Sequence, residues 1–406
     1  MQSTEEIVAK AAVLLSDRFG GNQTLTDIET LNGSGNAQVL RVRVATNPYL
    51  QERSVVVKYI PITDDELDDA ALVREVVAYQ FTTALSEDER PGPVLLAHDI
   101  AQRILVISDS GNGDTFAELL ERGDTQQRIH ILRNLGQSLG RMHRATANKE
   151  TDFETLRLRM AKKHPAAARV NRFRLVMQDY SMRTGYQKLL EAGIAVPDTV
   201  ALMLKESMDS SNVAHRAFSP FDLSPDNIIV AQRTQFLDYE WACFRNILLD
   251  IAAVIAGFPH YLFAKAISDD EVDILIDAWE RETSELWPEF RDDNARQLAI
   301  GRALLALAVS ELTLMHLGGS HNVVAAIAAD AAVGEDSITL NPEEITPLQH
   351  LLALPNSTEF SEGELLMRQD LLETFSALAR YASRSGNNKL AVVAEFATDI
   401  ATRLAD

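Results

Sequence analysis

Strand-like patterns occur in only two parts of the 406-residue chain, and nearly all of the rest has the spacing of helices. In the first part, residues 40–44 alternate apolar and basic side chains as a half-buried strand does, and residues 54–60 are rich in β-branched side chains. The second part is a hairpin pattern at residues 227–237. These patterns predict an α+β chain in two lobes, a small N-terminal lobe that contains a sheet and a large, mainly helical C-terminal lobe.

The boundary between the lobes is predicted at a polar stretch that contains two glycines. Residues 108–113, with the sequence Ser-Asp-Ser-Gly-Asn-Gly, follow an apolar strand pattern and have the composition of a loop. After this stretch, apolar residues recur mainly at helical spacing. We therefore expect an N-terminal lobe at residues 1–107, a hinge at 108–113 and a C-terminal lobe at 114–406.

Charge and cysteine content limit the partners of the chain. Its net charge of −21 argues against nucleic acid or an anionic membrane surface as the main partner, because both bind basic surfaces. The single cysteine, Cys243, excludes an intramolecular disulfide. Glu5 and Glu6 lie where a secretory signal would carry positive charge, and the most apolar stretch, residues 303–309, is too short to span a bilayer. We expect a cytoplasmic protein that binds neither nucleic acid nor membrane.

Three oxygen-bearing side chains cluster around the predicted hairpin. Asp222 and Asn227 lie on a loop that enters the first strand, and Asp238 follows the second strand. Because a hairpin returns on itself, Asn227 and Asp238 are expected to finish close together, and both offer the hard oxygen ligands that Mg²⁺ prefers. Asp222 lies where it could orient a hydroxyl or accept its proton. The alternative is a turn rich in Asp and Asn followed by an ordinary hairpin.

The N-terminal lobe adds a second set of candidate residues. Gly33, Ser34 and Gly35 precede the first predicted strand, and glycines there let backbone N–H groups approach phosphates, although such a turn is often only a turn. Lys58 lies in an apolar strand pattern, where an unpaired ammonium group would be costly to bury. We expect Lys58 to pair with Glu75 on the following helix, unless it faces solvent from an edge strand.

These features occur in one order: glycine loop, strand lysine, helix glutamate, connector, aspartate with asparagine, hairpin and a last aspartate. The order resembles the aminoglycoside phosphotransferase and choline kinase family, from about residue 31 to residue 255. Most of the resemblance lies in Asp-Leu-Ser-Pro-Asp-Asn at residues 222–227 and Asp-Tyr-Glu at residues 238–240. It implies a bilobal, protein-kinase-like fold with an antiparallel sheet in the N-terminal lobe.

The resemblance also implies a function, the ATP- and Mg²⁺-dependent transfer of phosphate to a hydroxyl group of a small molecule such as an aminoglycoside, an amino alcohol or a sugar. In the family, the catalytic aspartate aligns the acceptor hydroxyl, and here this residue is Asp222. The metal ligands that the resemblance implies are Asn227 and Asp238. The residues that it assigns to ATP are Gly33, Ser34, Gly35, Lys58, Glu75 and the hinge residues Ser108 and Ser110.

The sequence departs from the family pattern beside the catalytic aspartate. Pro220 and Phe221 stand where the family usually has His-Gly, and Ser224 and Asp226 stand where His and Gly are common. These departures keep open an alternative function, a kinase-like protein that binds nucleotide or acts as a scaffold with little catalysis. A protein substrate is disfavoured, because no recognisable activation segment follows Asp238.

Two further patterns have ordinary structural explanations. The string Gly-Gln-Ser-Leu-Gly at residues 136–140 matches the nucleophile elbow of hydrolases, which needs a strand before it and a helix after it. Here it lies inside a helical pattern at residues 129–143, which predicts a helix without a nucleophile. A basic stretch at residues 157–174 is typical of a solvated helix face, but it could also face an anionic group.

Overall fold

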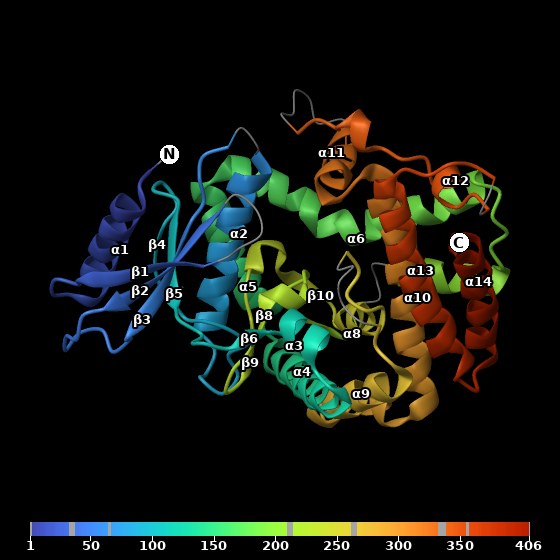
Figure 1. The fold of residues 1–406 in the computed structure, drawn as a ribbon, viewed down its shortest axis with the longest axis horizontal. Coiled ribbons are helices and arrows are strands. Elements are labelled where there is room, and N and C mark those ends of the chain that lie inside the picture. The colour runs from blue at the N-terminus through green and yellow to red at the C-terminus, as the bar shows by residue number, and fades with distance from the viewer. Residues whose placement is uncertain are drawn as a thin grey trace.

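The N-terminal strand patterns form one antiparallel sheet of five strands (Figure 1). This computed structural model describes residues 2–31, 37–63, 66–208, 214–260, 266–331, 338–354 and 357–405. The strands are β1 (Leu25–Leu31), β2 (Gln38–Val44), β3 (Ser54–Tyr59), β4 (Leu95–Asp99) and β5 (Ile104–Ser108). Their order in the sheet is β1-β2-β3-β5-β4, and all neighbouring pairs are antiparallel. The helices of this lobe are α1 (Thr4–Phe19) and α2 (Glu66–Thr83).

The sheet lies between α1 and α2. Successive side chains of a strand point to opposite faces of the sheet, so they contact the two helices in alternation. On β3, Val55 and Val57 pack in the same apolar cluster as Ile7 of α1. Val56 packs on the opposite side, in the cluster that contains the apolar residues of α2. Lys58 is two residues from Val56 and therefore shares the α2 face. This register is what directs the lysine towards the helix that carries the predicted glutamate.

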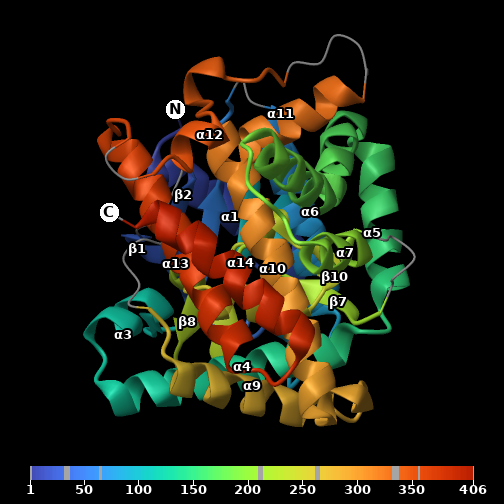
Figure 2. The ribbon, with the colours of Figure 1, turned by 90° about the vertical axis from the view of Figure 1, so that its right-hand side faces the viewer.

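The C-terminal lobe is mainly helical, as predicted, with two small antiparallel sheets (Figures 1 and 2). Its strands are β6 (Asp114–Thr115), β7 (Arg216–Ser219), β8 (Ile228–Val230), β9 (Thr234–Phe236) and β10 (Cys243–Asn246). Its helices are α3 (Phe116–Arg122), α4 (Thr125–Thr146), α5 (Glu150–Lys163), α6 (Pro165–Glu191), α7 (Asp198–Ser207), α8 (Leu248–Ile255), α9 (Asp269–Thr283), α10 (Asp293–Leu317), α11 (Ser320–Asp330), α12 (Leu348–Leu351), α13 (Glu362–Ser383) and α14 (Asn388–Leu404). The predicted fold class, a small sheet lobe joined to a large helical lobe, is confirmed.

The predicted hairpin lies where the two lobes meet, beside the segment that connects them. β8 and β9 form the hairpin, with Ile228 opposite Phe236, and β6 adds a third strand directly after the connector. Short 3₁₀ turns flank the hairpin at Pro225–Asn227 and Tyr239–Trp241. The backbone N–H of Phe236 also bonds to the carbonyl of Pro91, 2.9 Å away, which ties the hairpin to the segment before β4. The hairpin therefore lies against the N-terminal lobe.

Helix α10 lies at the centre of the C-terminal lobe, packed against α6, α8 and α13 (Figure 2). Among the described residues it is the one helix that is long and apolar enough to cross a membrane. However, 78% of its most apolar window is buried inside the protein. Its apolar surface therefore already forms the core of this lobe.

Two glycines in α4 allow it to pack closely on α9. A Cβ atom on Gly136 would lie 2.3 Å from the carbonyl oxygen of Leu275, and one on Gly140 would lie 3.0 Å from that of Trp279. Both glycines belong to the Gly-x-Ser-x-Gly string, which lies wholly within α4. The string is therefore a helix-packing feature, and the structure confirms that it is no nucleophile elbow.

Replacement of Gly136 by alanine is expected to lower the free energy of unfolding by about 1–3 kcal/mol, because the new methyl group collides with backbone rather than with a movable side chain. This loss outweighs the gain in helix propensity, about 1 kcal/mol. Gly363→Ala is the matched control, since its Cβ would meet no atom within 4 Å on α13. Urea unfolding compares the two variants. Equal stability of Gly136→Ala and wild type would contradict this packing.

Candidate active site

Lys58 joins three separate parts of the chain at one point between the lobes. Its Nζ atom lies 3.1 Å from Oε1 and 3.0 Å from Oε2 of Glu75, which α2 contributes. The same Nζ atom lies 2.8 Å from Oδ1 of Asp238, which follows the hairpin. The predicted pairing of Lys58 with Glu75 is confirmed, and its contact with Asp238 brings the hairpin to the same place.

The charges in this cluster stabilise each other. Burial alone would lower the pKa of the Lys58 ammonium group, but Glu75 and Asp238 outweigh burial and raise this pKa above its ordinary value. Burial raises the pKa of the Glu75 carboxyl, whose side chain is only 2% exposed, although Lys58 acts in the opposite direction. Lys58 therefore stays positively charged although only 14% of its side chain is exposed.

The hairpin holds the two predicted metal ligands next to each other. The backbone N–H of Leu237 donates to the carbonyl of Asn227 at 2.8 Å, so Asn227 lies beside the residue that precedes Asp238. Asp238 has a φ of +57°, a left-handed conformation that Asp adopts more readily than most residues. The expected closeness of Asn227 and Asp238 is confirmed. Their amide and carboxylate oxygens are donors of the kind that Mg²⁺ binds.

Asp222 lies at the wall of a cavity of about 420 Å³ in the C-terminal lobe. Its Oδ1 atom accepts a hydrogen bond from the backbone N–H of Ser224 at 2.9 Å, which fixes the carboxylate on its loop. Asp222 is exposed at the cavity wall, and partial removal of water by the protein around it, together with the negative charge of Asp238, raises the pKa of its carboxyl. A carboxylate in this position can orient a hydroxyl group of a molecule in the cavity.

A buried network supports the loop that carries Asp222. At its centre is Asp250 of α8, which is completely buried. Its Oδ1 atom accepts a hydrogen bond from Ser219 Oγ at 2.7 Å and pairs with the guanidinium of Arg245. Its Oδ2 atom lies 3.0 Å from Nε2 of His143. Burial would raise the pKa of the Asp250 carboxyl, but Arg245 and His143 hold that pKa below its usual value.

The orientation of His143 follows from its second partner. The indole N–H of Trp279 can only donate, and it lies 3.0 Å from Nδ1 of His143. Nδ1 must therefore be the acceptor, so the ring proton is on Nε2 and points to Asp250. In the hydrogen-bonded series Trp279, His143 and Asp250, each N–H donor therefore faces an acceptor.

Phe221 explains one departure from the family pattern. Its φ is +71°, in the left-handed region where glycine is favoured, and the family usually has glycine at this position. For phenylalanine such a conformation costs on the order of 1–3 kcal/mol. Its N–H donates to Ser219 Oγ at 2.9 Å, and Arg245 Nη2 donates to its carbonyl at 3.1 Å. The network around Asp250 therefore holds this left-handed backbone without glycine.

Four side chains that sequence analysis did not connect form a continuous stack, and three of them line the cavity beside Asp222. The rings of Phe221 and Trp241 are stacked with centroids 6.2 Å apart. The guanidinium of Arg245 lies 4.3 Å from the centre of the Phe221 ring, and that of Arg174 lies 3.9 Å from the centre of the Trp241 ring. Arg174 belongs to the basic stretch, and its Nη1 also donates to the carbonyl of Glu240. This part of the stretch is internal, not a solvated face.

The connector between the lobes is fixed by a residue that sequence analysis did not single out. Asp109 accepts hydrogen bonds from Ser54 Oγ at 2.7 Å and pairs with Arg41 Nε at 3.0 Å. The N–H of Ser108 bonds to the carbonyl of Val94, so it is already engaged within the N-terminal lobe. Contact between adenine and Ser108 or Ser110 stays a prediction. Gly33, Ser34 and Gly35 lie outside the described residues.

Arg74, the neighbour of Glu75, anchors α2 to the C-terminal lobe. Its Nε and Nη2 atoms donate to the side chain and the carbonyl of Asn171 on α6, at 3.0 and 2.9 Å. Its Nη1 atom donates to the carbonyl of Ala242 at 3.0 Å. These bonds set the position of α2, and so of Glu75, relative to the segment after Asp238.

No protein-family model matches the chain, and no curated protein matches it. It is similar to solved structures of low sequence identity. A choline kinase from Cryptosporidium parvum Iowa II is 12% identical, over 80% of this chain and 90% of that chain, with a TM-score of 0.47. The choline kinase LicA from Streptococcus pneumoniae is 11% identical, over 93% and 100%, with a TM-score of 0.44. The gentamicin complex of APH(2″)-IIa is 10% identical, over 84% and 100%, with a TM-score of 0.42.

Proposed function

We propose that the protein is an ATP- and Mg²⁺-dependent phosphotransferase that phosphorylates a hydroxyl group of a small molecule. The observation that carries this proposal is the contact of Lys58 with both Glu75 and Asp238. That contact joins the sheet, α2 and the hairpin in the arrangement that a nucleotide-phosphate site of the kinase type requires. The cavity beside Asp222 provides space for the acceptor.

Lys58, Glu75 and Asp222 have distinct proposed roles. Lys58, held by Glu75, presents a fixed positive charge to the phosphates of ATP. Asp222 orients the acceptor hydroxyl and can take up its proton as the hydroxyl oxygen bonds to phosphorus. Positioning of two substrates and neutralisation of their charge supply most of the rate enhancement in such reactions.

Asn227 and Asp238 carry side-chain oxygen atoms of the kind that bind a magnesium ion. One contributes an amide oxygen and the other a carboxylate, and the bond between Leu237 and Asn227 keeps the two residues adjacent. Mg²⁺ bound there would neutralise negative charge on the terminal phosphates of ATP. The ion pair between Lys58 and Asp238 supports this proposal, because it places Asp238 beside the lysine that is proposed to bind the phosphates.

Binding of ATP is expected to stabilise the protein only when Mg²⁺ is present, because the phosphates need both Lys58 and the metal. At an ATP concentration 100 times Kd the gain is about 2.7 kcal/mol, which a thermal-shift measurement resolves. In Asp238→Asn the Mg²⁺-dependent part of the shift should disappear. Asp88→Asn removes the same charge from a side chain that is 94% exposed and should behave like wild type.

The outcomes separate the proposed function from its alternative. A nucleotide-binding protein without catalysis would show the Mg²⁺-dependent shift but no consumption of ATP with any acceptor. No shift with ATP, with or without Mg²⁺, would overturn both. If Asp238→Asn and Asp88→Asn lost the Mg²⁺-dependent thermal shift to the same extent, overall charge rather than the site around Lys58 would determine binding.

A further inference from the structure

The charges that line the acceptor cavity are balanced within the protein. Its lining contains two carboxylates, Asp222 and Glu311, and two basic side chains, Arg245 and His260. A site for a cationic ligand normally offers carboxylates or aromatic faces that lack a partner until the ligand binds. Apart from Asp222 and the buried Phe258, which packs against Phe116, the groups of this kind in the cavity already contact cations of the chain itself.

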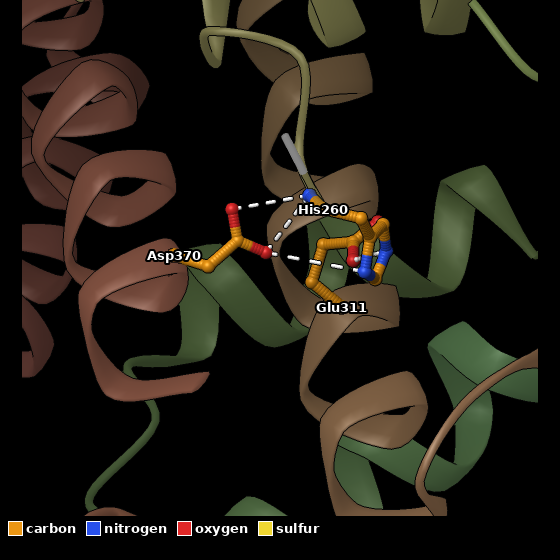
Figure 3. Close-up of side chains that lie close together, drawn as sticks. All are labelled: His260, Glu311 and Asp370. Atoms are coloured by element: carbon orange, nitrogen blue, oxygen red, sulfur yellow. Dashed lines mark hydrogen bonds and ion pairs between the residues drawn. The ribbon is translucent and has the colours of Figure 1, made fainter. Parts of the chain in front are cut away.

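The first such group is Glu311, which lines the cavity, and together with Asp370, which does not, it holds His260 between two buried carboxylates (Figure 3). Nε2 of His260 lies 2.6 Å from Oε2 of Glu311 on α10, and Nδ1 lies 4.0 Å from Oδ2 of Asp370 on α13. The backbone N–H of His260 also donates to both oxygens of Asp370, at 2.9 and 3.1 Å. Glu311 and Asp370 are only 6% and 7% exposed, so each needs a positive partner.

Surrounding charges keep His260 protonated. The imidazole is 48% exposed, and the protein that displaces water from the rest of it would lower its pKa, but Glu311, Asp370 and Asp222 outweigh this effect and raise the pKa to about 9. Burial raises the pKa of Asp370 to about 6, while His260 acts against this rise. At neutral pH the imidazole is therefore a cation, and it lies where an ammonium group would otherwise bind the two carboxylates.

The same three residues are close enough to suggest a metal site, since their ligand atoms lie within 4.8 Å of one another. The geometry favours an ion pair instead. Glu311 faces Nε2 while Asp370 faces Nδ1, so the two carboxylates contact different nitrogens of the ring. A metal ion on one nitrogen would need both carboxylates to converge on that side.

The second group comprises the aromatic rings of the cavity wall. Quaternary ammonium ligands bind the open faces of such rings. Here one face of Phe221 is covered by Arg245 and one face of Trp241 by Arg174, and the rings stack on each other. These two rings are therefore already engaged in cation–π contacts within the chain. This observation is independent of His260.

We propose that the acceptor is an uncharged, hydroxyl-bearing molecule, and that His260 occupies the place that an ammonium group would take between Glu311 and Asp370. This proposal rests on the proposed function, because it takes the cavity beside Asp222 as the acceptor site. Much of the remaining lining is apolar, including Met177, Leu307 and Leu314. A neutral molecule with an apolar body fits such a lining better than a polycation does.

Choline and its uncharged carbon isostere dimethylbutanol test this proposal, because the two molecules have the same shape and differ in charge. Calorimetry is performed on the whole protein with both probes. Wild type is expected to show no saturable binding of choline. His260→Gln leaves Glu311 and Asp370 without a cation among the residues that the structure describes, so it should bind choline at least tenfold more tightly than wild type does. The double variant His260→Gln/Glu311→Gln should lose that gain, and affinity for dimethylbutanol should be alike in all three proteins.

Saturable binding of choline to wild type would overturn the proposal, whether or not the variants fold. Absence of choline binding in a folded His260→Gln variant would do the same. If Zn²⁺ stabilised wild type but not His260→Gln, the three residues would form a metal site, and this result would also overturn the proposal. Binding of Mg²⁺ and ATP, measured on the same preparations, reports on the proposed function separately, since the choline experiment needs no nucleotide.

The pH dependence of stability provides a second measurement. Because the pKa of His260 is raised from 6.5 to about 9 in the folded protein, its stabilising effect is complete below pH 6.5 and is lost as pH rises through about 9. Asp370, with its pKa raised to about 6, is charged over that range. Wild type should therefore exceed His260→Gln in Tm at pH 7, and the difference should shrink above pH 9. A constant difference would contradict a protonated His260.

Discussion

Replacement of Asp222 by asparagine is expected to lower acceptor-dependent phosphate transfer by about 10²–10⁴-fold, the usual contribution of a positioned general base. The amide keeps the size of the side chain and can still accept the hydrogen bond from Ser224, but it cannot take up the proton of the acceptor hydroxyl. Binding of Mg²⁺ and ATP should persist, because Lys58, Asn227 and Asp238 are untouched. Initial rates of ATP consumption at saturating acceptor, with calorimetry for ATP, check both parts.

Asp226→Asn is the matched control for this experiment. Asp226 is an exposed aspartate on the same loop, and it does not line the cavity. Its replacement should change the rate by less than about threefold, as expected for a group outside the reaction site. If Asp222→Asn retained wild-type turnover, the assignment of Asp222 as the residue that orients the acceptor would be wrong.

Replacement of Asp250 by alanine is expected to lower the free energy of unfolding by about 3–5 kcal/mol, the typical cost when one partner of a buried ion pair is removed. Arg245, Ser219 and His143 all direct a donor at this carboxylate, and Asp250 is completely buried. Guanidinium unfolding followed by circular dichroism measures the loss.

Two further variants define what the loss of Asp250 means. Asp277→Ala, which removes an exposed aspartate from α9, should change stability by less than about 0.5 kcal/mol. Ser219→Ala removes the hydroxyl that accepts the N–H of Phe221, so it should cost roughly 1–3 kcal/mol and reduce turnover through the loop of Asp222. An Asp250→Ala protein as stable as Asp277→Ala would show that the network contributes nothing to the fold.

Local patterns were sufficient to predict the elements that contain or flank Lys58, Glu75 and Asp238. The run of β-branched residues marks β3 and turn chemistry marks the hairpin of β8 and β9, while α2 is a long helix that is buried on most of its faces. Once Lys58 was placed in a strand and Glu75 on the next helix, the pairing rule for buried charges predicted their contact. The structure places Nζ of Lys58 3.0 Å from Glu75.

Elements with weak local signals were missed. β1 has a mostly exposed, polar sequence at the edge of the sheet, so no apolar alternation marks it as a strand. β7 and β10 are short, and they pair across a long stretch of chain, with Cys243 opposite Ser219. Such strands are specified by tertiary pairing more than by local preference.

The cavity could not be predicted for a similar reason. Glu311 and Asp370 come from two helices of the C-terminal lobe, and His260 follows a third. Nothing in the sequence near any one of them indicates the other two. Phe221 was apparent only as a departure from the family pattern, and its left-handed backbone and its contacts with Arg245 emerge from the fold.

The central claim, phosphate transfer to a small-molecule hydroxyl, is tested most directly by mass spectrometry of acceptors incubated with the protein, ATP and Mg²⁺. The acceptor panel should contain sugars, macrolides and other uncharged alcohols beside choline, homoserine and aminoglycosides, and Asp222→Asn should be run in parallel. The account predicts a phosphorylated product from an uncharged acceptor, formed only with Mg²⁺ and strongly reduced in Asp222→Asn. A protein that binds no ATP in the presence of Mg²⁺ and phosphorylates none of these acceptors would contradict it.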